Sequence, residues 1–489
     1  MHAARPSKSK KIYMSVLWTI QDMATAMRAE KTGALPEAIT GISIDTRTIG
    51  KGDAFFALTD ARDGHDFVEA ALKAGAALAV VARDKRDRFP ADAPLLVVDD
   101  VLEALRDLGR AARARLKGQV IAVTGSVGKT GTKEALRLAF SAEGETHASA
   151  ASYNNHWGVP LSLARCPASA QYAVFEIGMN HAGEITPLVG MVRPHIAIIT
   201  TIAPVHLEYF GSLEKIADAK AEIFTGIVPG GVAVLNRDND QFARLEAAAK
   251  AAGIARIVTF GEAAQTEARL IRFALQDESS TVEADILGHH VAYKLGAPGR
   301  HLVMNSLAVL AAVELAGADM AHAALALTHL KPAIGRGARA TLRVPGGQAL
   351  LIDESYNANP ASMAAAIALL GQAPVGMRGR RIAVLGDMLE LGAPGAALHA
   401  GLAAALAEAK IDLVFCSGPL MHSLWEALPS GRKGGYAETS AALEPQVLEA
   451  VRAGDAVMVK GSLGSKMGPI VKALERQFPR EDAVAAAKV

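Results

Sequence analysis

The sequence predicts an α/β protein of three domains, with a parallel sheet in the central domain and a Rossmann-like α/β unit in the C-terminal one. Three observations predict this fold. A length of 489 residues suggests about three domains at roughly 150 residues each. From about Val120 onward, short β-branched runs alternate with Ala- and Leu-rich helical segments, which is typical of βαβ units in a mostly parallel sheet. The same alternation resumes near Ile382, in a smaller unit.

The elements follow in this order along the chain. We expect a loose tail over residues 1–13 and three domains over residues 14–113, 114–338 and 339–489. A glycine-rich joint at 335–339 interrupts helical periodicity between the last two domains. The strands expected in the central domain are 120–123, 172–175, 196–200 and 232–235, and those in the C-terminal domain are 382–385, 413–415 and 456–459.

Composition restricts the function. The 51 basic and 50 acidic residues nearly cancel, so no global field attracts nucleic acid or an anionic membrane, and any phosphate binding must be local. Cys166 and Cys416 match no metal spacing and argue against a disulfide framework, which favours a reduced, cytoplasmic compartment. The sequence has no run of 18 or more apolar residues, so no membrane span is expected.

The N-terminal segment allows two interpretations. Basic residues before the apolar stretch 12–20, with 24–26 as a cleavage site, imitate an export signal. The stretch is short, however, and Thr19 followed by Asp22 predicts the capped start of an amphipathic helix. We favour the helix.

A glycine-rich loop joins the strand 120–123 to a helix expected over 131–140. Backbone N–H groups of such a loop, together with the helix N-terminus, hold phosphate oxygens. We expect Lys129 to neutralise the β- and γ-phosphates and Thr130 to offer its hydroxyl to Mg²⁺. General phosphate loops have glycine where this chain has Val123, so a plain turn with a solvated lysine is the alternative. The expected phosphate-binding residues are Thr124, Gly125, Ser126, Val127, Gly128, Lys129 and Thr130.

Three further polar side chains follow later strands. Glu176 ends the strand 172–175, where ligands gather beyond the carboxyl ends of parallel strands, and it offers Mg²⁺ a hard oxygen ligand. His206 follows the next strand, and Lys220 follows His206 on a helix. Taken singly, each has a structural alternative: a solvated glutamate, a core histidine and a surface lysine. Their order after the phosphate loop favours one shared site.

The order of these motifs resembles that of the Mur ligase family. Its members carry Thr-Gly-Ser-x-Gly-Lys-Thr, Glu-x-Gly, His-x-x-x-x-Gly and Ala-Lys-x-Glu-Ile, which this chain matches at 124–130, 176–178, 206–211 and 219–223. The resemblance spans residues 18–470 and implies ATP and two Mg²⁺ ions as cofactors. It implies a catalytic set of Lys129, Glu176, His206 and Lys220, and a metal-binding set of Thr130, Glu176, His206 and a carbamylated Lys220.

The resemblance implies further contacts. Asn305 would contact adenine, Arg336 the phosphates and Asp353 the ribose of ATP. The uridine diphosphate end of a substrate would bind near Ser43, Asp45, Thr46 and Arg47, and its peptide near Asn154 and Asn155.

Segments 351–363 and 385–392 resemble the family member that adds D-alanyl-D-alanine to UDP-N-acetylmuramoyl-tripeptide. This implies those two substrates, an amide bond formed through an acyl phosphate, and a monomer. The substrate-binding residues would be Ser355, Tyr356, Asn357 and Asn359. The alternatives are a diaminopimelate- or lysine-adding ligase, folylpolyglutamate synthase, a phosphate-loop switch or motor, and a non-catalytic nucleotide-binding scaffold.

Overall fold

The computed structural model describes residues 16–150 and 152–481, which form two compact units. Unit 1 comprises residues 16–118 and 152–173, and unit 2 comprises residues 119–150 and 174–481. The tail expected over 1–13 lies outside the described residues. In the described part of the chain, no helix combines the length and the apolar character needed to cross a bilayer.

Unit 1 is built on a five-stranded sheet in the order β2-β7-β6-β5-β4. The strands from β7 to β4 pair in parallel, whereas β2 runs antiparallel to β7. Apolar side chains are buried on both faces of this sheet. The elements are β1 (Trp18–Thr19), α1 (Ile20–Met27), β2 (Glu30–Thr32), β3 (Ala38–Ile39), β4 (Gly41–Ser43), β5 (Asp53–Phe56), α2 (Val68–Lys73), β6 (Leu78–Ala82), β7 (Leu95–Val98), α3 (Val101–Arg115) and α5 (Gly158–Ala164).

Helix α5 joins unit 1 from the middle of the chain. It packs on α3, where Gly109 leaves room for it: a Cβ on that glycine would lie 3.2 Å from the carbonyl oxygen of Pro160. The indole N–H of Trp18 donates to the carbonyl of Ala164 over 2.8 Å. Segment 152–173 therefore belongs to unit 1, although in sequence it lies within the range expected for the central domain.

The expected capped helix at the N-terminus is confirmed as α1. The hydroxyl of Thr19 accepts the backbone N–H of Asp22 over 3.1 Å, and Met23 and Met27 are buried on the inner face. Residues 24–26, the alternative cleavage site, lie inside this helix.

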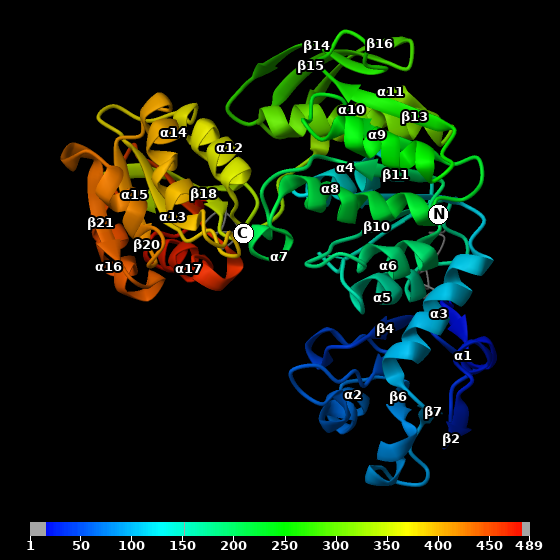
Figure 1. The fold of residues 1–489 in the computed structure, drawn as a ribbon. Coiled ribbons are helices and arrows are strands. Elements are labelled where there is room, and N and C mark those ends of the chain that lie inside the picture. The colour runs from blue at the N-terminus through cyan, green and yellow to red at the C-terminus, as the bar shows by residue number, and fades with distance from the viewer. Residues whose placement is uncertain (1–15, 151, 482–489) are drawn as a thin grey trace, which may run out of the picture. The chain divides into compact units, whose positions relative to one another are not determined.

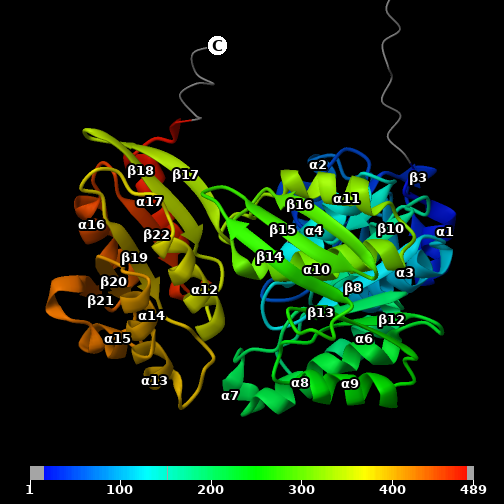
Figure 2. The ribbon, with the colours of Figure 1, turned by 90° about the horizontal axis from the view of Figure 1, so that it is seen from above.

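Unit 2 contains a nine-stranded sheet in the order β16-β15-β14-β13-β12-β11-β8-β10-β9. Strands β8, β11, β12, β13 and β14 pair in parallel, and β14 to β16 continue as an antiparallel ribbon beside α10 and α11 (Figure 2). The strands are β8 (Gln119–Thr124), β9 (Thr146–Ala148), β10 (Tyr172–Glu176), β11 (Ile196–Ile199), β12 (Val232–Asn236), β13 (Arg256–Gly261), β14 (Ala268–Leu275), β15 (Ser280–Ile286) and β16 (His289–Leu295). The helices are α4 (Lys129–Ser141), α6 (Ile185–Val192), α7 (Leu207–Phe210), α8 (Leu213–Ala221), α9 (Phe242–Ala251), α10 (Arg300–Leu315) and α11 (Met320–Ala326).

A second sheet of unit 2 has the order β17-β18-β22-β19-β20-β21 and is parallel except for β17. Helices α12, α14 and α15 cover one face, and α16 and α17 cover the other (Figure 1). The elements are β17 (Ala338–Val344), β18 (Gly347–Glu354), α12 (Pro360–Gly371), β19 (Arg381–Gly386), α13 (Gly395–Ala400), α14 (Leu402–Glu408), β20 (Leu413–Ser417), α15 (His422–Ala427), β21 (Lys433–Ala437), α16 (Ser440–Ala450), β22 (Ala456–Lys460) and α17 (Gly468–Gln477).

The predicted α/β class and each predicted strand are confirmed. The helix after the phosphate loop begins earlier than expected, at Lys129 instead of Gly131. The ribbon β14 to β16 was not predicted, because its strands carry charges on their exposed faces and lack the continuous apolar runs of buried parallel strands.

Replacing Thr19 by alanine tests the cap of α1. Loss of the hydroxyl leaves the Asp22 N–H without its acceptor, at a cost of about 1 kcal/mol, so the α1 amides should exchange hydrogen roughly fivefold faster. Hydrogen exchange read by mass spectrometry measures this. Thr19→Ser keeps the acceptor and should exchange at the wild-type rate; equal rates for all three proteins would refute the cap.

Candidate active site

Two neighbouring strands of the nine-stranded sheet end beside the phosphate loop. The loop follows β8, and β11 pairs with β8 in parallel up to Ile199 and Thr124. β10 is the other neighbour of β8, and the N–H of Ile177 donates to the carbonyl of Val123 over 2.9 Å. Glu176 and the segment that leads to His206 therefore lie at the same sheet edge as the loop. Ligands of open parallel sheets bind at this edge, beyond the carboxyl ends of the strands.

The phosphate loop requires two of its glycines. Gly125 has φ +144° and a Cβ there would lie 2.0 Å from the hydroxyl of Thr200. Gly128 has φ +92° and its Cβ would lie 2.5 Å from the side-chain nitrogen of Asn305. These conformations leave the N-terminus of α4 open toward an anion. The Ser126 hydroxyl is buried and has no hydrogen-bond partner within the described residues, which suits a loop that binds phosphate oxygens.

The side chain of Lys129 folds back onto the phosphate loop. Its ammonium donates to the carbonyl of Gly125 over 2.7 Å. Burial lowers its pKa, with a smaller contribution from Arg336, and the charge of Glu176 opposes the shift. Arg336 thus lies within electrostatic range of Lys129.

Thr130 and Glu176 form a buried pair of oxygen donors. The hydroxyl of Thr130 donates to the Glu176 carboxylate over 2.9 Å, and the two residues are 5% and 1% exposed. Hard oxygens of this kind fit Mg²⁺, which takes few protein ligands and keeps water and substrate phosphate for the rest. No three His, Cys, Asp or Glu side chains form a metal cluster in residues 16–150 and 152–481.

Lys220 is a buried lysine in the last turn of α8. Its side chain is about 1% exposed, and burial lowers its pKa well below the ordinary value, followed by repulsion from Lys129. A lysine of lowered pKa carries a neutral, nucleophilic amine, which is the form that reacts with carbon dioxide to give a carbamate.

His206 lies at the start of α7, within electrostatic range of both lysines. Burial lowers its pKa, and the charges of Lys220 and Lys129 act in the same direction, whereas Glu390 opposes them. A neutral imidazole is the form that binds metal. The Nδ1 atom of His206 forms a hydrogen bond with the carboxylate of Glu390, a residue that the sequence reasoning missed. Its only signal was membership of the segment 385–392.

Asp353 organises the predicted joint. Its carboxylate accepts the N–H of Gly335 over 3.0 Å, and it also accepts the N–H and the hydroxyl of Ser355 over 3.1 and 2.6 Å. One carboxylate oxygen thus holds the backbone before β17, and the other holds the residue after β18. The guanidinium of Arg336 lies 4.4 Å from the ring centre of Tyr356.

The other residues of this predicted substrate loop have local partners. Asn359 caps α12 by accepting the N–H of Ser362 over 2.9 Å. The backbone carbonyl of Asn357 accepts a hydrogen bond from the buried ammonium of Lys460 over 2.9 Å. Lys460 also forms an ion pair with Glu354 at 3.1 Å, so it joins the end of β18 to the loop that follows it.

The predicted residues of unit 1 form two small motifs. Asp45 caps a 3₁₀ turn (Thr46–Thr48) and accepts the backbone and side-chain N–H groups of Arg47, each over 2.9 Å. The side-chain bond first, then the backbone bond, lowers the pKa of Asp45 to about 2. Ser43 shares a hydrogen bond of 2.9 Å with Thr48.

The asparagine pair, the second motif, precedes α5. The side chain of Asn155 accepts the N–H of Gly158 over 2.9 Å, which is the capping use that its sequence context allows. Asn154 precedes it in the chain and is half-buried.

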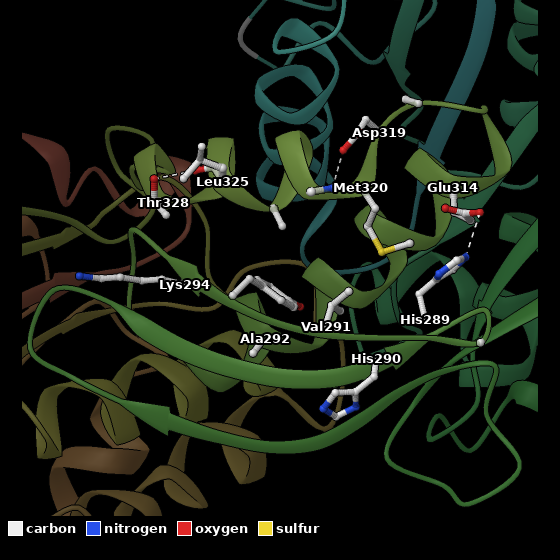
Figure 3. A pocket seen from close by; sticks show the side chains of 15 residues that line it. His289, His290, Val291, Ala292, Lys294, Glu314, Asp319, Met320, Leu325 and Thr328 are labelled. Carbon is white, nitrogen blue, oxygen red and sulfur yellow. Dashed lines mark hydrogen bonds and ion pairs between the residues drawn. The ribbon is translucent and has the colours of Figure 1, made fainter.

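A separate pocket of about 900 Å³ lies between β16 and α11 (Figure 3). His289 pairs with Glu314 across it at 3.5 Å, and Asp319 caps α11 at its rim. None of the predicted site residues lines this pocket.

Known proteins match this chain along most of its length. Residues 123–313 match the Mur ligase middle domain, residues 339–463 the glutamate ligase domain of Mur ligases, and residues 38–113 the catalytic domain of the Mur ligase family. UDP-N-acetylmuramoyl-tripeptide--D-alanyl-D-alanine ligase of Escherichia coli (strain K12) is 34% identical over 94% of this chain and 98% of its own. The chain belongs to the Mur ligase family. It is an ATP-dependent ligase that forms a carbon–nitrogen bond.

Solved structures agree with this assignment. MurF from Acinetobacter baumannii is 30% identical to this Mur ligase, covers 94% of it and 99% of its own chain, and superimposes with a TM-score of 0.79. MurF from Thermotoga maritima, solved in complex with ADP, is 25% identical, covers 89% and 97%, and has a TM-score of 0.72.

Replacing Gly125 by alanine should weaken nucleotide binding by this Mur ligase. The added Cβ would clash with Thr200 and the residue would be strained at φ +144°, so we expect affinity for a fluorescent ADP analogue to fall by more than about tenfold. Gly131→Ala is the matched control, because its Cβ would meet only Leu302 at 3.8 Å. Fluorescence titration compares the two, and wild-type affinity in Gly125→Ala would contradict the loop geometry.

The buried Lys220 should make stability depend on pH. Between its lowered folded pKa and the ordinary value of 10.5, the unfolded chain binds a proton that the folded chain does not, so stability rises with pH in that window. Thermal unfolding midpoints in buffer free of carbon dioxide should therefore rise more steeply with pH for wild type than for Lys220→Met. Lys215→Met, an exposed position on the same helix, should match wild type. Parallel profiles for wild type and Lys220→Met would exclude a shifted lysine.

Proposed function

We propose that this Mur ligase adds D-alanyl-D-alanine to UDP-N-acetylmuramoyl-tripeptide, with conversion of ATP to ADP and phosphate. The observation that carries the proposal is the set of phosphate loop, Glu176, His206 and Lys220 at one edge of the central sheet, in a chain whose Escherichia coli relative is named for this reaction. The bound ADP of the Thermotoga maritima relative supports the assignment of the loop to ATP.

The chemistry requires activation of a carboxylate. A carboxylate oxygen of the tripeptide attacks the γ-phosphorus of ATP, the bond to the β-phosphate oxygen breaks, and ADP leaves. The amine of D-alanyl-D-alanine then attacks the acyl carbon, loses a proton, and expels phosphate from the tetrahedral intermediate. Lys129 and the N-terminus of α4 stabilise the negative charge that develops on the transferring phosphoryl group.

We propose two Mg²⁺ ions for this site. Thr130, Glu176 and His206 would hold them, and the ions would supply positive charge to the phosphoryl group. Lys220 would contribute as a carbamate. An ammonium about 4 Å from a cation is repelled by about 4 kcal/mol per charge pair at an effective dielectric constant of 20, whereas a carbamate is attracted.

We propose a division of labour along the chain. Residues 14–113, with Ser43, Asp45, Thr46 and Arg47, would bind the uridine diphosphate end, and Asn154 and Asn155 would bind the peptide. Residues 114–338 would bind ATP, with Asn305 at adenine and Arg336 at phosphate. Residues 339–489 would bind D-alanyl-D-alanine through Ser355, Tyr356, Asn357 and Asn359, and would place Asp353 at the ribose.

The remaining proposals concern the cell. We propose a cytoplasmic monomer that binds no nucleic acid. Cys166 and Cys416 are buried and do not form a disulfide with each other, which fits a reducing compartment, and the near-zero net charge disfavours a polyanionic partner.

A phosphate-release assay tests the proposed reaction. With UDP-N-acetylmuramoyl-tripeptide and ATP, D-alanyl-D-alanine should stimulate release, whereas lysine, diaminopimelate and glutamate should not, and mass spectrometry should show the joined product. Glu176→Gln should lower kcat by about 10²- to 10³-fold, as expected for loss of one charge-stabilising group.

Each alternative function predicts a different result in this assay. Stimulation by a single amino acid would assign the chain to another ligase of the superfamily. ATP hydrolysis without an acceptor would indicate a switch or motor, and full function in Lys129→Met would indicate a scaffold.

A further inference from the structure

The contact between His206 and Glu390 joins residues 184 positions apart. His206 follows β11 of the central sheet and begins α7, whereas Glu390 lies in the loop after β19 of the C-terminal sheet. Neither side chain is fully exposed: 26% of the histidine and 41% of the glutamate side chain is accessible. The contact therefore brings a carboxylate of the C-terminal part to a proposed metal ligand.

The chemistry of this contact determines which ring nitrogen carries the proton. A carboxylate can only accept a hydrogen bond, so Nδ1 of His206 must donate to Glu390. In a neutral imidazole the proton on Nδ1 leaves the lone pair on Nε2. That nitrogen is then the one available to a metal ion, as in metal sites where a carboxylate orients a ligating histidine through its other nitrogen.

The backbone supports the same docking. The N–H of Glu208 donates to the carbonyl of Glu390 over 3.1 Å, so side chain and main chain bind the same two segments. Gly392 has no side chain, and this allows the close approach, because a Cβ there would lie 3.3 Å from Cα of Glu208. His206 and Glu390 have φ values of 54° and 62°, a left-handed conformation that is strained for residues with a Cβ and that recurs at functional sites.

We propose that Glu390 is a positioning residue of this ligase, which fixes the ring and the tautomer of His206 so that the Nε2 lone pair would be available to a metal ion. The inference rests on the proposed role of His206 as a metal ligand. It makes metal binding in the central domain depend on docking of the 385–392 loop.

Manganese binding measures this dependence without turnover. Mn²⁺ replaces Mg²⁺ in the presence of a non-hydrolysable ATP analogue, and electron paramagnetic resonance reports both the free ion and its coupling to an imidazole nitrogen. Glu390→Ala should weaken Mn²⁺ binding about tenfold and reduce the nitrogen coupling, the effect typical of removing a carboxylate partner of a ligating histidine. Glu390→Gln keeps an oxygen acceptor for Nδ1 and should restore most of the affinity. Glu449→Ala, exposed on α16, is the control and should bind as wild type does.

The outcomes separate the inference from the function that it presumes. Wild type without nitrogen coupling, or with the same coupling as His206→Ala, would overturn the proposed metal role of His206 and this inference with it. Wild-type coupling and affinity in Glu390→Ala would overturn the inference alone. Tighter Mn²⁺ binding in Glu390→Ala would also overturn it, because the carboxylate would then compete with the metal for the histidine. Thermal unfolding of each variant identifies any loss of folding.

Discussion

The burial of two lysines close to each other is the constraint on which the rest of the active site depends. Burial lowers the pKa of both Lys129 and Lys220. The charge of Lys129 lowers the pKa of Lys220 further, whereas the charge of Glu176 opposes the shift at Lys129. Such an arrangement is costly for a protein by itself, because buried like charges repel in a low-dielectric environment. In the proposed mechanism, the phosphates of ATP would bring negative charge to the site, and a carbamate on Lys220 would replace one positive charge by a negative one. Under that proposal the charges of the site balance only when substrate is bound.

Sequence reasoning found the residues that follow strands in motif order. Glu176 ends its strand, Thr130 follows its strand through the phosphate loop, and His206 comes later after the next strand, so their order predicts one edge of the sheet. The structure pairs Thr130 with Glu176 and puts His206 within electrostatic range of Lys129. Their roles in metal binding stay predictions. The sequence could not place Glu390, since its contact with His206 depends on tertiary packing between two sheets and no local periodicity records it.

Two other differences have local causes. Asn359 was assigned to substrate, yet Asn-Pro followed by Ser362 is also a helix start, and the structure uses its side chain as the cap of α12. This reduces the hydrogen bonds that Asn359 can offer a ligand. The joint at 335–339 was predicted from its glycines, but its anchor was not: the Asp353 carboxylate accepts Gly335 on one side and Ser355 on the other, and so ties the joint to the substrate loop.

The insertion of α5 into unit 1 means that the chain crosses between the two units three times, near residues 118, 151 and 173. A fragment that ends at 118 would lack the helix that covers α3 and the carbonyl that receives the Trp18 N–H. The N-terminal part therefore cannot be separated, exchanged or duplicated as a single stretch of sequence without exposing an apolar helix face. Recombination within this family would preserve both units only by exchanging the discontinuous segments together.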